Sequence, residues 1–479
     1  KLLYEKTQGN PFFLGQLLKS LHREGLLFFD FEANAWRWNI EQIRQQNITD
    51  NVVELMLAKL QELPSETQTV LQFAACIGNT FDLKTLSIVY QTSIEQTMQT
   101  LWTAVQSGFI IPLDQNYRAF LNQANHAAIQ SATFKFQHDR VQQAAYELIA
   151  TSQKPIMHHA IARLLLQNTS EIELEANIFE IVNHWNHAIA LVSEPSERLQ
   201  LVRLNQIAGH KAKSSAAYEY SFSYFNLALS CLPENDWQSN YDSTLELYLS
   251  TAQAAYLTGH FERLEELCDA ILDHAQTLLD QVQAYELQIQ AYVAQNRLTE
   301  AVDQALVVLQ SLSIHITPEL QNATTLSDSE IQDLASLPDM TQLQWLAAMR
   351  ILASVEAATY YAVPAIHPQL VQTAINLSIE HGNSPESVFF YAVYGQVLCS
   401  SHTTLAKGLQ FGQLASTLLS QLIDKDLKAR TLVNLEGFVN HWGAAIHQSI
   451  PQLMTTYHLG VESGDLEFAA LALHCHCLH

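Results

Sequence analysis

The stretch Phe134-Lys135-Phe136-Gln137-His138-Asp139-Arg140-Val141, followed by Gln142-Gln143-Ala144-Ala145-Tyr146, decides the fold of the first third of the chain. Up to residue 137 the apolar side chains alternate, as they do in a strand that is buried on one face. From residue 139 onward they recur at helical spacing. The sequence therefore predicts a strand that passes directly into an amphipathic helix, with a His-Asp pair at the junction.

Short helices and a second strand are expected around this junction. Apolar residues recur at helical spacing from Thr49 to Leu63, before Pro64 interrupts the pattern. The further elements expected here are helices capped by Ser65, Asp82 and Ser93, a turn at residues 78–80, and strands over residues 108–113 and 133–137. This order of helices and strands is that of a winged helix, which we assign to residues 46–152.

The residues before it predict a helix followed by a β-hairpin. Pro11 stands in the first turn of a helix expected over residues 10–24, and Gly25 ends it. Two aromatic-rich segments, residues 26–31 and 35–40, are expected to pair as the hairpin. We treat residues 1–45 as one region.

A repeating helical pattern fills the rest of the chain. Beyond Pro155 strand patterns disappear, and helices of roughly 12 to 17 residues recur with short breaks. Turns at Gly382, Asp424 and Gly464 each precede an apolar helix, and 464 − 382 = 82 is twice a period of 41. Periods of about this length are typical of helical pairs. We predict a mainly α fold in which residues 153–479 form an α-solenoid of tetratricopeptide-like pairs whose concave face binds protein.

The charge of the chain limits its partners. Acidic residues outnumber basic ones by 48 to 24, which gives a formal net charge of −24. Such a charge repels phosphate backbones, and the candidate recognition helix, residues 82–91, carries Lys84 as its single basic residue. No nucleic-acid partner is therefore expected. The acidic excess predicts instead that the concave face of the array favours basic proteins.

Membrane segments and disulfides are not expected either. No apolar run reaches the roughly 18 residues that a membrane span requires. The six cysteines, at positions 76, 231, 268, 399, 475 and 477, match neither a disulfide framework nor paired Cys-x-x-Cys segments. We therefore expect a reducing, cytoplasmic location.

Metal ligands are few. Cys475 and His479 are four positions apart and would share a helix face, but a closed zinc site needs four ligands in fixed geometry. No metal site is therefore expected. The histidines that occur in close pairs are expected on helix surfaces: His158, His159, His184 and His187.

The segment Gly9-Asn10-Pro11-Phe12-Phe13, the His-Asp pair and the helical repeats follow one another in a distinctive order. In this order the chain resembles the second half of a STAND-type, AAA+ related signal-transduction NTPase, with a Gly-x-Pro segment in its helical lid and a His-Asp segment ending its winged helix. With Gly-Asp-Leu-Glu-Phe-Ala at residues 464–469, it is also similar to the middle region of large bacterial multidomain serine/threonine and histidine kinases. The resemblance covers essentially all 479 residues and implies that residues 1–45 are the C-terminal lid end of an NTPase domain.

The resemblance also implies nucleotide contacts. Gly9 would set the turn, Pro11 would lie against the nucleotide, and His138 would reach the diphosphate of ADP through a ring N–H. Two plainer interpretations stay open: Pro11 as the first-turn residue of an ordinary helix, and His138 packed locally beside a helix-capping Asp139. The implied cofactors are ATP or ADP with Mg in the parent protein, and none in this segment alone.

No catalytic residue is expected. The sequence lacks a Gly-x-x-x-x-Gly-Lys-Ser/Thr phosphate loop, so it provides no lysine and backbone cradle for a triphosphate. His138-Asp139-Arg140 differs in order from the His-Arg-Asp of kinases, and no Asp-Phe-Gly follows. Whether this chain is an enzyme is left open, and the resemblance implies a parent that is an ATP-binding serine/threonine and histidine kinase.

These patterns predict a regulatory and scaffolding role. The chain is expected to be a segment of a longer protein, with its repeat array truncated at the C-terminus. Binding of a partner or signal to the repeats would be coupled to nucleotide state, the partners being other proteins or other domains of the same chain. The alternative is the repeat-containing sensor region of a STAND-type transcription activator. The oligomeric state is left open.

Overall fold

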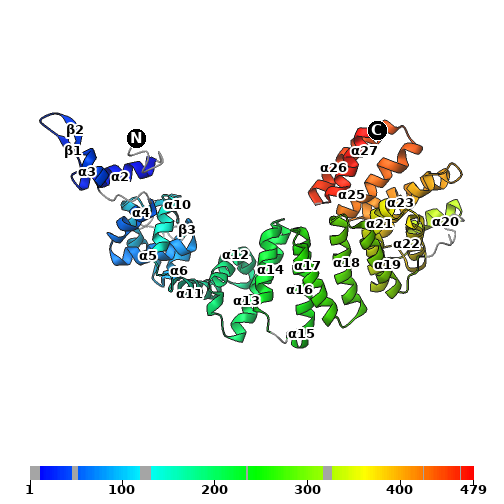
Figure 1. Ribbon diagram of the computed structural model, residues 1–479, viewed down its shortest axis with the longest axis horizontal. Helices are drawn as coiled ribbons and strands as arrows, with labels where there is room; N and C mark the ends of the chain where they lie inside the picture. Colours follow the sequence, from blue (N-terminus) through cyan, green and yellow to red (C-terminus); the bar gives the residue numbers. More distant parts are fainter. Residues whose placement is uncertain are drawn as a thin grey trace. The chain divides into compact units, whose positions relative to one another are not determined.

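The computed structural model describes residues 11–45, 52–118, 131–233, 236–316, 326–423, 425–463 and 465–479. The chain forms two compact units (Figure 1). Unit 1 comprises residues 1–215 and 230–232, and unit 2 comprises residues 216–229 and 233–479. The described residues are mainly helical, as predicted.

Unit 1 begins with a helix and a hairpin at the predicted places. The elements are α2 (Pro11–Arg23), β1 (Leu27–Asp30), β2 (Ala35–Trp38) and α3 (Ile40–Gln45). The hairpin is antiparallel, with Leu27 opposite Trp38. Leu17 and Leu21 of α2 are buried against Ile43 of α3, so this region has a small apolar core of its own.

The next part of unit 1 is a bundle of short helices with one small sheet. Its helices are α4 (Val52–Gln61), α5 (Ser65–Ile77), α6 (Leu83–Tyr90), α7 (Ile94–Gln106) and α10 (Asp139–Glu147). Its strands are β3 (Thr80–Asp82), β4 (Ile110–Pro112) and β5 (Thr133–Phe136), in the antiparallel order β3-β5-β4. This order of elements agrees with the winged helix that the sequence predicts. The domain boundaries remain a prediction.

Local signals in the sequence account for most of these elements. The alternation of residues 133–137 arises because Phe134 and Phe136 are fully buried whereas Lys135 is not. The carboxylate of Asp82 and the hydroxyl of Ser93 accept backbone hydrogen bonds at the starts of α6 and α7, as expected. The prediction that Ser65 caps α5 is wrong, because Pro64 occupies the N-cap position and Ser65 is already helical.

Three helices complete unit 1: α11 (Lys154–Gln167), α12 (Glu171–His187) and α13 (Pro195–Ser214). Ser170 and Glu173 form a capping box at the start of α12, which satisfies backbone donors that the first turn leaves unpaired. Helix α11 packs against α12 and also against α6. The α4–α10 bundle and the helices that follow it therefore share a packing surface within unit 1.

Unit 2 is an array of helices. The elements are α14 (Tyr218–Cys231, up to residue 229), α15 (Asp236–Ser239), α16 (Tyr241–Leu257), α17 (Phe261–His274), α18 (Leu278–Ala294), α19 (Leu298–Ser311), α20 (Asp328–Asp333), α21 (Leu343–Ala362), α22 (His367–His381), α23 (Pro385–Cys399), α24 (Leu405–Leu418), α25 (Lys425–Asn434), a π-helical turn (Leu435–Val439), α26 (Ile450–Ser463) and α27 (Leu466–Leu478). Helix α16 packs against α17, α17 against α18, and α18 against α19. Each helical pair therefore buries part of the next one, as in an α-solenoid.

The predicted period appears in the helix starts. Helices α23, α25 and α27 begin at residues 385, 425 and 466, which gives spacings of 425 − 385 = 40 and 466 − 425 = 41. Gly382 ends α22, shortly before the first of these helices, whereas Asp424 and Gly464 lie outside the described residues. The repeats are nevertheless irregular, because α21 stands as an additional long helix between α19 and the α22–α23 pair.

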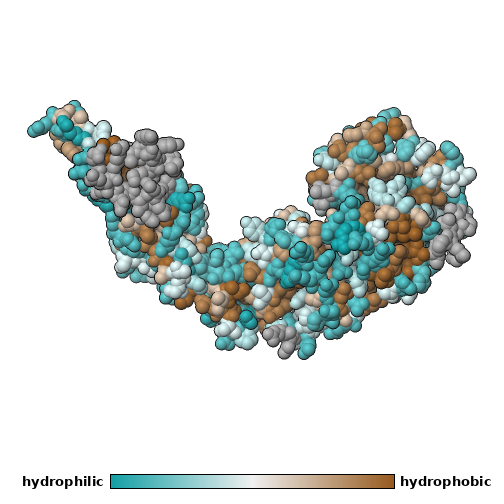
Figure 2. Space-filling view, viewed as in Figure 1, coloured by the Kyte–Doolittle hydropathy of each residue, from teal (hydrophilic) through white to brown (hydrophobic). Residues whose placement is uncertain are grey.

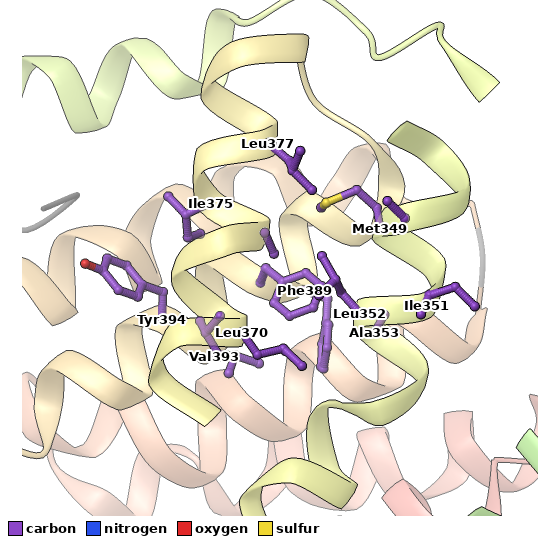
Figure 3. Packing of buried hydrophobic residues seen from close by; sticks show 14 of the residues in the cluster. Met349, Ile351, Leu352, Ala353, Leu370, Ile375, Leu377, Phe389, Val393 and Tyr394 are labelled. Carbon is purple, nitrogen blue, oxygen red and sulfur yellow. The ribbon is translucent and has the colours of Figure 1, made fainter. Parts of the chain in front are cut away.

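The largest hydrophobic core of unit 2 lies around α21, α22 and α23. Figure 3 shows the side chains of Leu352, Leu370 and Phe389 meeting between these helices. Helix α23 is buried almost all round, which explains why its sequence is apolar without the one-sided pattern of a surface helix. Among the described helices, none combines the length and apolar character that crossing a bilayer requires.

Candidate functional site

His138 occupies the N-cap of α10, at the junction that the sequence singles out. Its Nδ1 accepts a hydrogen bond from the backbone N–H of Arg140 at 3.2 Å. A ring nitrogen that accepts carries no proton, so neutral His138 has its ring proton on Nε2. The cap therefore selects the tautomer in which Nε2–H is a donor.

Asp139 does not cap α10. The alternative interpretation of the junction, with a capping Asp139 beside a locally packed His138, is wrong on this point, because the helix begins at Asp139 and the residue before it is the cap. The Asp139 carboxylate instead accepts a hydrogen bond of 2.9 Å from the side-chain amide of Asn79, just before β3. This contact links the start of α10 to the sheet.

Of the other two predicted nucleotide contacts, Pro11 is the one that lies within the described residues. Pro11 is the exposed first residue of α2, and Gly9 lies outside the described residues. Pro11 begins α2, whereas His138 caps α10, so the two residues stand on separate elements. Nucleotide contact by Gly9, Pro11 and His138 stays a prediction.

A buried histidine pair lies beside α10, and it corrects an expectation. His158 and His184, which were expected on helix surfaces, are only 4% and 5% exposed. Their Nδ1 atoms are 2.7 Å apart, and the Tyr146 hydroxyl lies 3.0 Å from Nε2 of His158. The expectation fails because both residues lie on the faces of α11 and α12 that pack together, where their rings hydrogen bond with each other.

Burial sets the charge of this pair. It lowers the pKa of His158 to about 4 and that of His184 to about 3, and the neighbouring histidines act in the same direction. At neutral pH both rings are therefore uncharged, and a single proton lies between the two Nδ1 atoms. His187 stacks on His158 with ring centroids 4.7 Å apart.

A cavity of about 390 Å³ opens beside these rings. Asp139, Gln142 and Tyr146 of α10 line it together with Cys76, His158 and His187. Burial raises the pKa of the Cys76 thiol to about 12, so this cysteine is not a nucleophile at neutral pH. The cavity brings the His-Asp helix next to the histidine pair but assembles no catalytic set.

Unit 2 contains a larger concave site, which we call the groove. It consists of two hollows, of about 900 Å³ and about 510 Å³, that share Ala357, Glu467 and Phe468 as lining residues. The larger hollow lies along α16, α18, α21 and α27, and amide and aromatic side chains such as Gln253, Tyr256 and Gln290 line it. The smaller hollow lies between α21, α25 and α27.

Two carboxylates line the smaller hollow, together with the polar side chains of Gln396, Asn434 and His474. Glu356 is buried, and its Oε1 lies 2.8 Å from Nε2 of His367. Glu467 is exposed on α27. The surrounding walls partly desolvate the Glu467 carboxylate and raise its pKa, whereas Arg430 lowers it and the carboxylates of Asp465 and Glu356 raise it further. Arg430 itself pairs with Asp465 at 2.6 Å, so its charge is already matched.

Figure 2 shows hydrophobic surface over the α26–α27 end of unit 2. There Leu473 and Leu478 are 37% and 69% exposed, and Leu478 also lines the smaller hollow. Across the hollow, Tyr360 and Tyr361 of α21 are 51% and 63% exposed. The smaller hollow thus combines negative charge with aromatic and aliphatic walls.

The absence of a metal site stays a prediction. In the part of the chain that the structure describes, no group of three or more suitable side chains is arranged to hold an ion. Cys475 is buried, and its carbonyl accepts a hydrogen bond of 2.9 Å from the backbone N–H of His479. This pair at the C-terminal end closes a helical turn.

No protein-family model matches the chain. The chain is similar to a hybrid signal transduction histidine kinase G of Dictyostelium discoideum, with 26% identity over 551 aligned positions that include 98% of this chain and 16% of that protein. It is also similar to the peroxide stress-activated histidine kinase mak3 of Schizosaccharomyces pombe, with 20% identity over 275 positions, 55% of this chain and 11% of that protein. The chain thus spans a small part of the length of both relatives.

Among the solved structures similar to the chain is a signal transduction ATPase with numerous domains that carries a tetratricopeptide repeat sensor, from Pyrococcus horikoshii. The alignment has 12% identity and a TM-score of 0.29, and it covers 100% of this chain and 71% of that one. A TM-score this low does not establish a shared fold.

The groove is the site that the sequence did not locate. Its carboxylates, Glu356 and Glu467, lie on α21 and α27, far apart in the chain, and only the packing of unit 2 places them in one hollow. Its one indication in the sequence is the acidic excess, which identifies no residue.

Proposed function

We propose that this chain is a regulatory segment of a larger signal-transduction histidine kinase. The observation that supports it most is the similarity to a hybrid signal transduction histidine kinase over 98% of the chain. In this proposal the helical array of unit 2 binds a protein partner or another domain of the same protein, and the α4–α10 bundle is a winged helix next to a STAND-type NTPase core.

The coupling would be conformational. A partner that binds the array more tightly in one arrangement of the whole protein shifts the equilibrium toward that arrangement, and nucleotide binding changes by the same factor. His138 is the residue that would carry the nucleotide end of this coupling. Its cap hydrogen bond supports the proposal, because it leaves the ring proton on Nε2, where a phosphate oxygen could accept it.

Residues 1–479 alone are expected to bind neither ATP nor ADP with micromolar affinity. The reason is that the sequence has no phosphate loop, whose backbone and lysine supply most contacts to the phosphates. Isothermal titration calorimetry with each nucleotide in the presence of Mg²⁺ measures this directly. Micromolar binding would contradict the assignment of the nucleotide site to a separate core.

In the parent protein, His138→Ala is expected to weaken the binding of ADP by about tenfold. This is the effect of losing one hydrogen bond to a charged group. The measurement is the rate at which labelled ADP dissociates from purified protein. His210→Ala, a change of an exposed histidine on α13, is the control. If the His138→Ala protein keeps ADP as long as the unmodified protein does, His138 is only a helix cap and the proposed coupling through it is wrong.

A further inference from the structure

We propose that the smaller hollow receives an arginine or lysine side chain of an extended peptide whose backbone continues along the larger hollow. The inference rests on the proposed function, because it takes the array of unit 2 as the part that binds a partner. It adds the chemistry of that partner and the residues that recognise it: Glu356, Glu467, Tyr360 and Tyr361.

The first step of the argument is charge. Among the described residues that line the groove, Arg430 is the one arginine or lysine, against the carboxylates of Glu356, Asp465 and Glu467. Asp465 already has Arg430 as its partner at 2.6 Å, and Glu356 has Nε2 of His367 at 2.8 Å. Glu467 forms no ion pair within the described part of the chain. An incoming cation would therefore pair with the carboxylate of Glu467 and would not have to displace Arg430 from Asp465.

The position of Asp465 strengthens this step. Its carboxylate also caps α27 by accepting the backbone N–H of Phe468 at 3.2 Å. The guanidinium of Arg430 lies 5.0 Å from the centre of the Phe468 ring, so the arginine is held by an acid on one side and a ring on the other. Arg430 is thus fixed in the wall, and Glu467, two positions after Asp465, remains to contact a ligand.

The second step is the shape and chemistry of the walls. Tyr360 and Tyr361 expose aromatic surface, and cations bind favourably over such rings. Phe438 and Leu471 supply apolar surface that suits the methylene stem of a long basic side chain. A lysine or arginine side chain combines a cationic head with an apolar stem. A metal ion or a phosphate does not combine the two.

The third step is the continuation of the groove. The larger hollow shares Ala357, Glu467 and Phe468 with the smaller one, so a chain anchored in the first can run directly into the second. Gln253 and Gln290 line this part, and amide side chains can both donate to and accept from a peptide backbone. The occupant that fits is therefore a basic peptide segment. A nucleic acid would be repelled by the same carboxylates.

The test uses the full 479-residue chain and fluorescein-labelled synthetic peptide pools of about nine residues with randomised neutral flanks. The central residue of each pool is arginine, lysine, glutamine or glutamate. Fluorescence anisotropy is expected to show binding of the arginine and lysine pools at least about tenfold tighter than the glutamate pool, with affinity that falls as salt is raised.

Two variants locate the binding. Glu467→Gln is expected to lower the affinity for the arginine pool by about tenfold, because it removes a charge-assisted contact. Glu246→Gln, which changes an exposed carboxylate of α16 that does not line the groove, is expected to leave affinity unchanged and matches the change in net charge. Thermal unfolding of both variants checks that each is folded.

Two results overturn the inference in different ways. Equal binding of the four pools, or equal effects of Glu467→Gln and Glu246→Gln, would show that the hollow does not select a basic side chain, while the array would still bind peptides. Binding of no pool would overturn the inference together with the proposed partner binding by the array.

Discussion

Lowering the pH from about 7.5 to about 5 is expected to destabilise unit 1 by about 4 kcal/mol through His158 and His184. Folding lowers the pKa of these residues to about 4 and about 3, whereas an unfolded histidine has a pKa near 6.5. Between these values the unfolded chain binds protons that the folded chain does not. Stability is therefore present above about pH 6.5 and is lost as the pH falls toward the folded pKa values.

The size of the effect follows from the unfolded pKa. A pH of about 5 is about 1.5 units below the pKa of an unfolded histidine. Protonation therefore stabilises the unfolded chain by about 2 kcal/mol for each histidine. The folded pair resists protonation chiefly because both rings are buried. A proton added to the accepting Nδ1 would also face the N–H of the other ring across 2.7 Å. The two contributions add because at about pH 5 both folded rings are still neutral, whereas both unfolded histidines are protonated.

Hydrogen exchange of α12 as a function of pH measures this effect where it arises. The double variant His158→Gln and His184→Gln is expected to lose most of the pH dependence, whatever its stability at neutral pH. His210→Gln on α13 serves as the control, because His210 is exposed and its replacement should leave the pH dependence in place. An unchanged pH dependence in the double variant would contradict the assignment.

The parts of the fold that the sequence predicted are those with local causes. The change from β5 to α10 is visible because Phe134 and Phe136 alternate with polar neighbours and apolar spacing changes after Asp139. Asp82 and Ser93 are predictable as caps because a cap depends only on nearby residues. Each side chain accepts a hydrogen bond from the backbone N–H three residues later. These contacts depend on neighbouring residues alone.

The parts that the sequence did not predict depend on distant contacts. The short strand β3 exists because Phe81 pairs with Phe134 of β5, and three residues carry too little pattern to be predicted alone. The histidine pair needs the packing of α11 against α12. The groove needs Glu356 and Glu467 to meet across two helices, so a general acidic excess was all that the sequence could indicate.

The second large effect concerns Gly382, the residue that ends α22. Gly382→Ala is expected to destabilise unit 2 by about 3 kcal/mol or more. Gly382 has a φ of 99°, where a Cβ is strained, and an added Cβ would also overlap the carbonyl oxygen of Pro338. That carbonyl accepts the backbone N–H of Asn383 at 2.8 Å, and the carbonyl of Asn383 accepts the N–H of Met340 at 2.8 Å. A displaced Pro338 would therefore disturb the bridge that ties the segment before α21 to the turn before α23.

Gly259→Ala separates the two causes. Gly259, in the turn before α17, has a φ of 74°, but an added Cβ would meet no atom within 4 Å. Its replacement is expected to cost about 1 kcal/mol, since only the left-handed backbone is strained. Urea unfolding of both variants measures the difference, which we expect to be about 2 kcal/mol. Equal losses would mean that the Pro338 carbonyl moves aside freely, and that the contact between Pro338 and the turn at Gly382 does not stabilise unit 2.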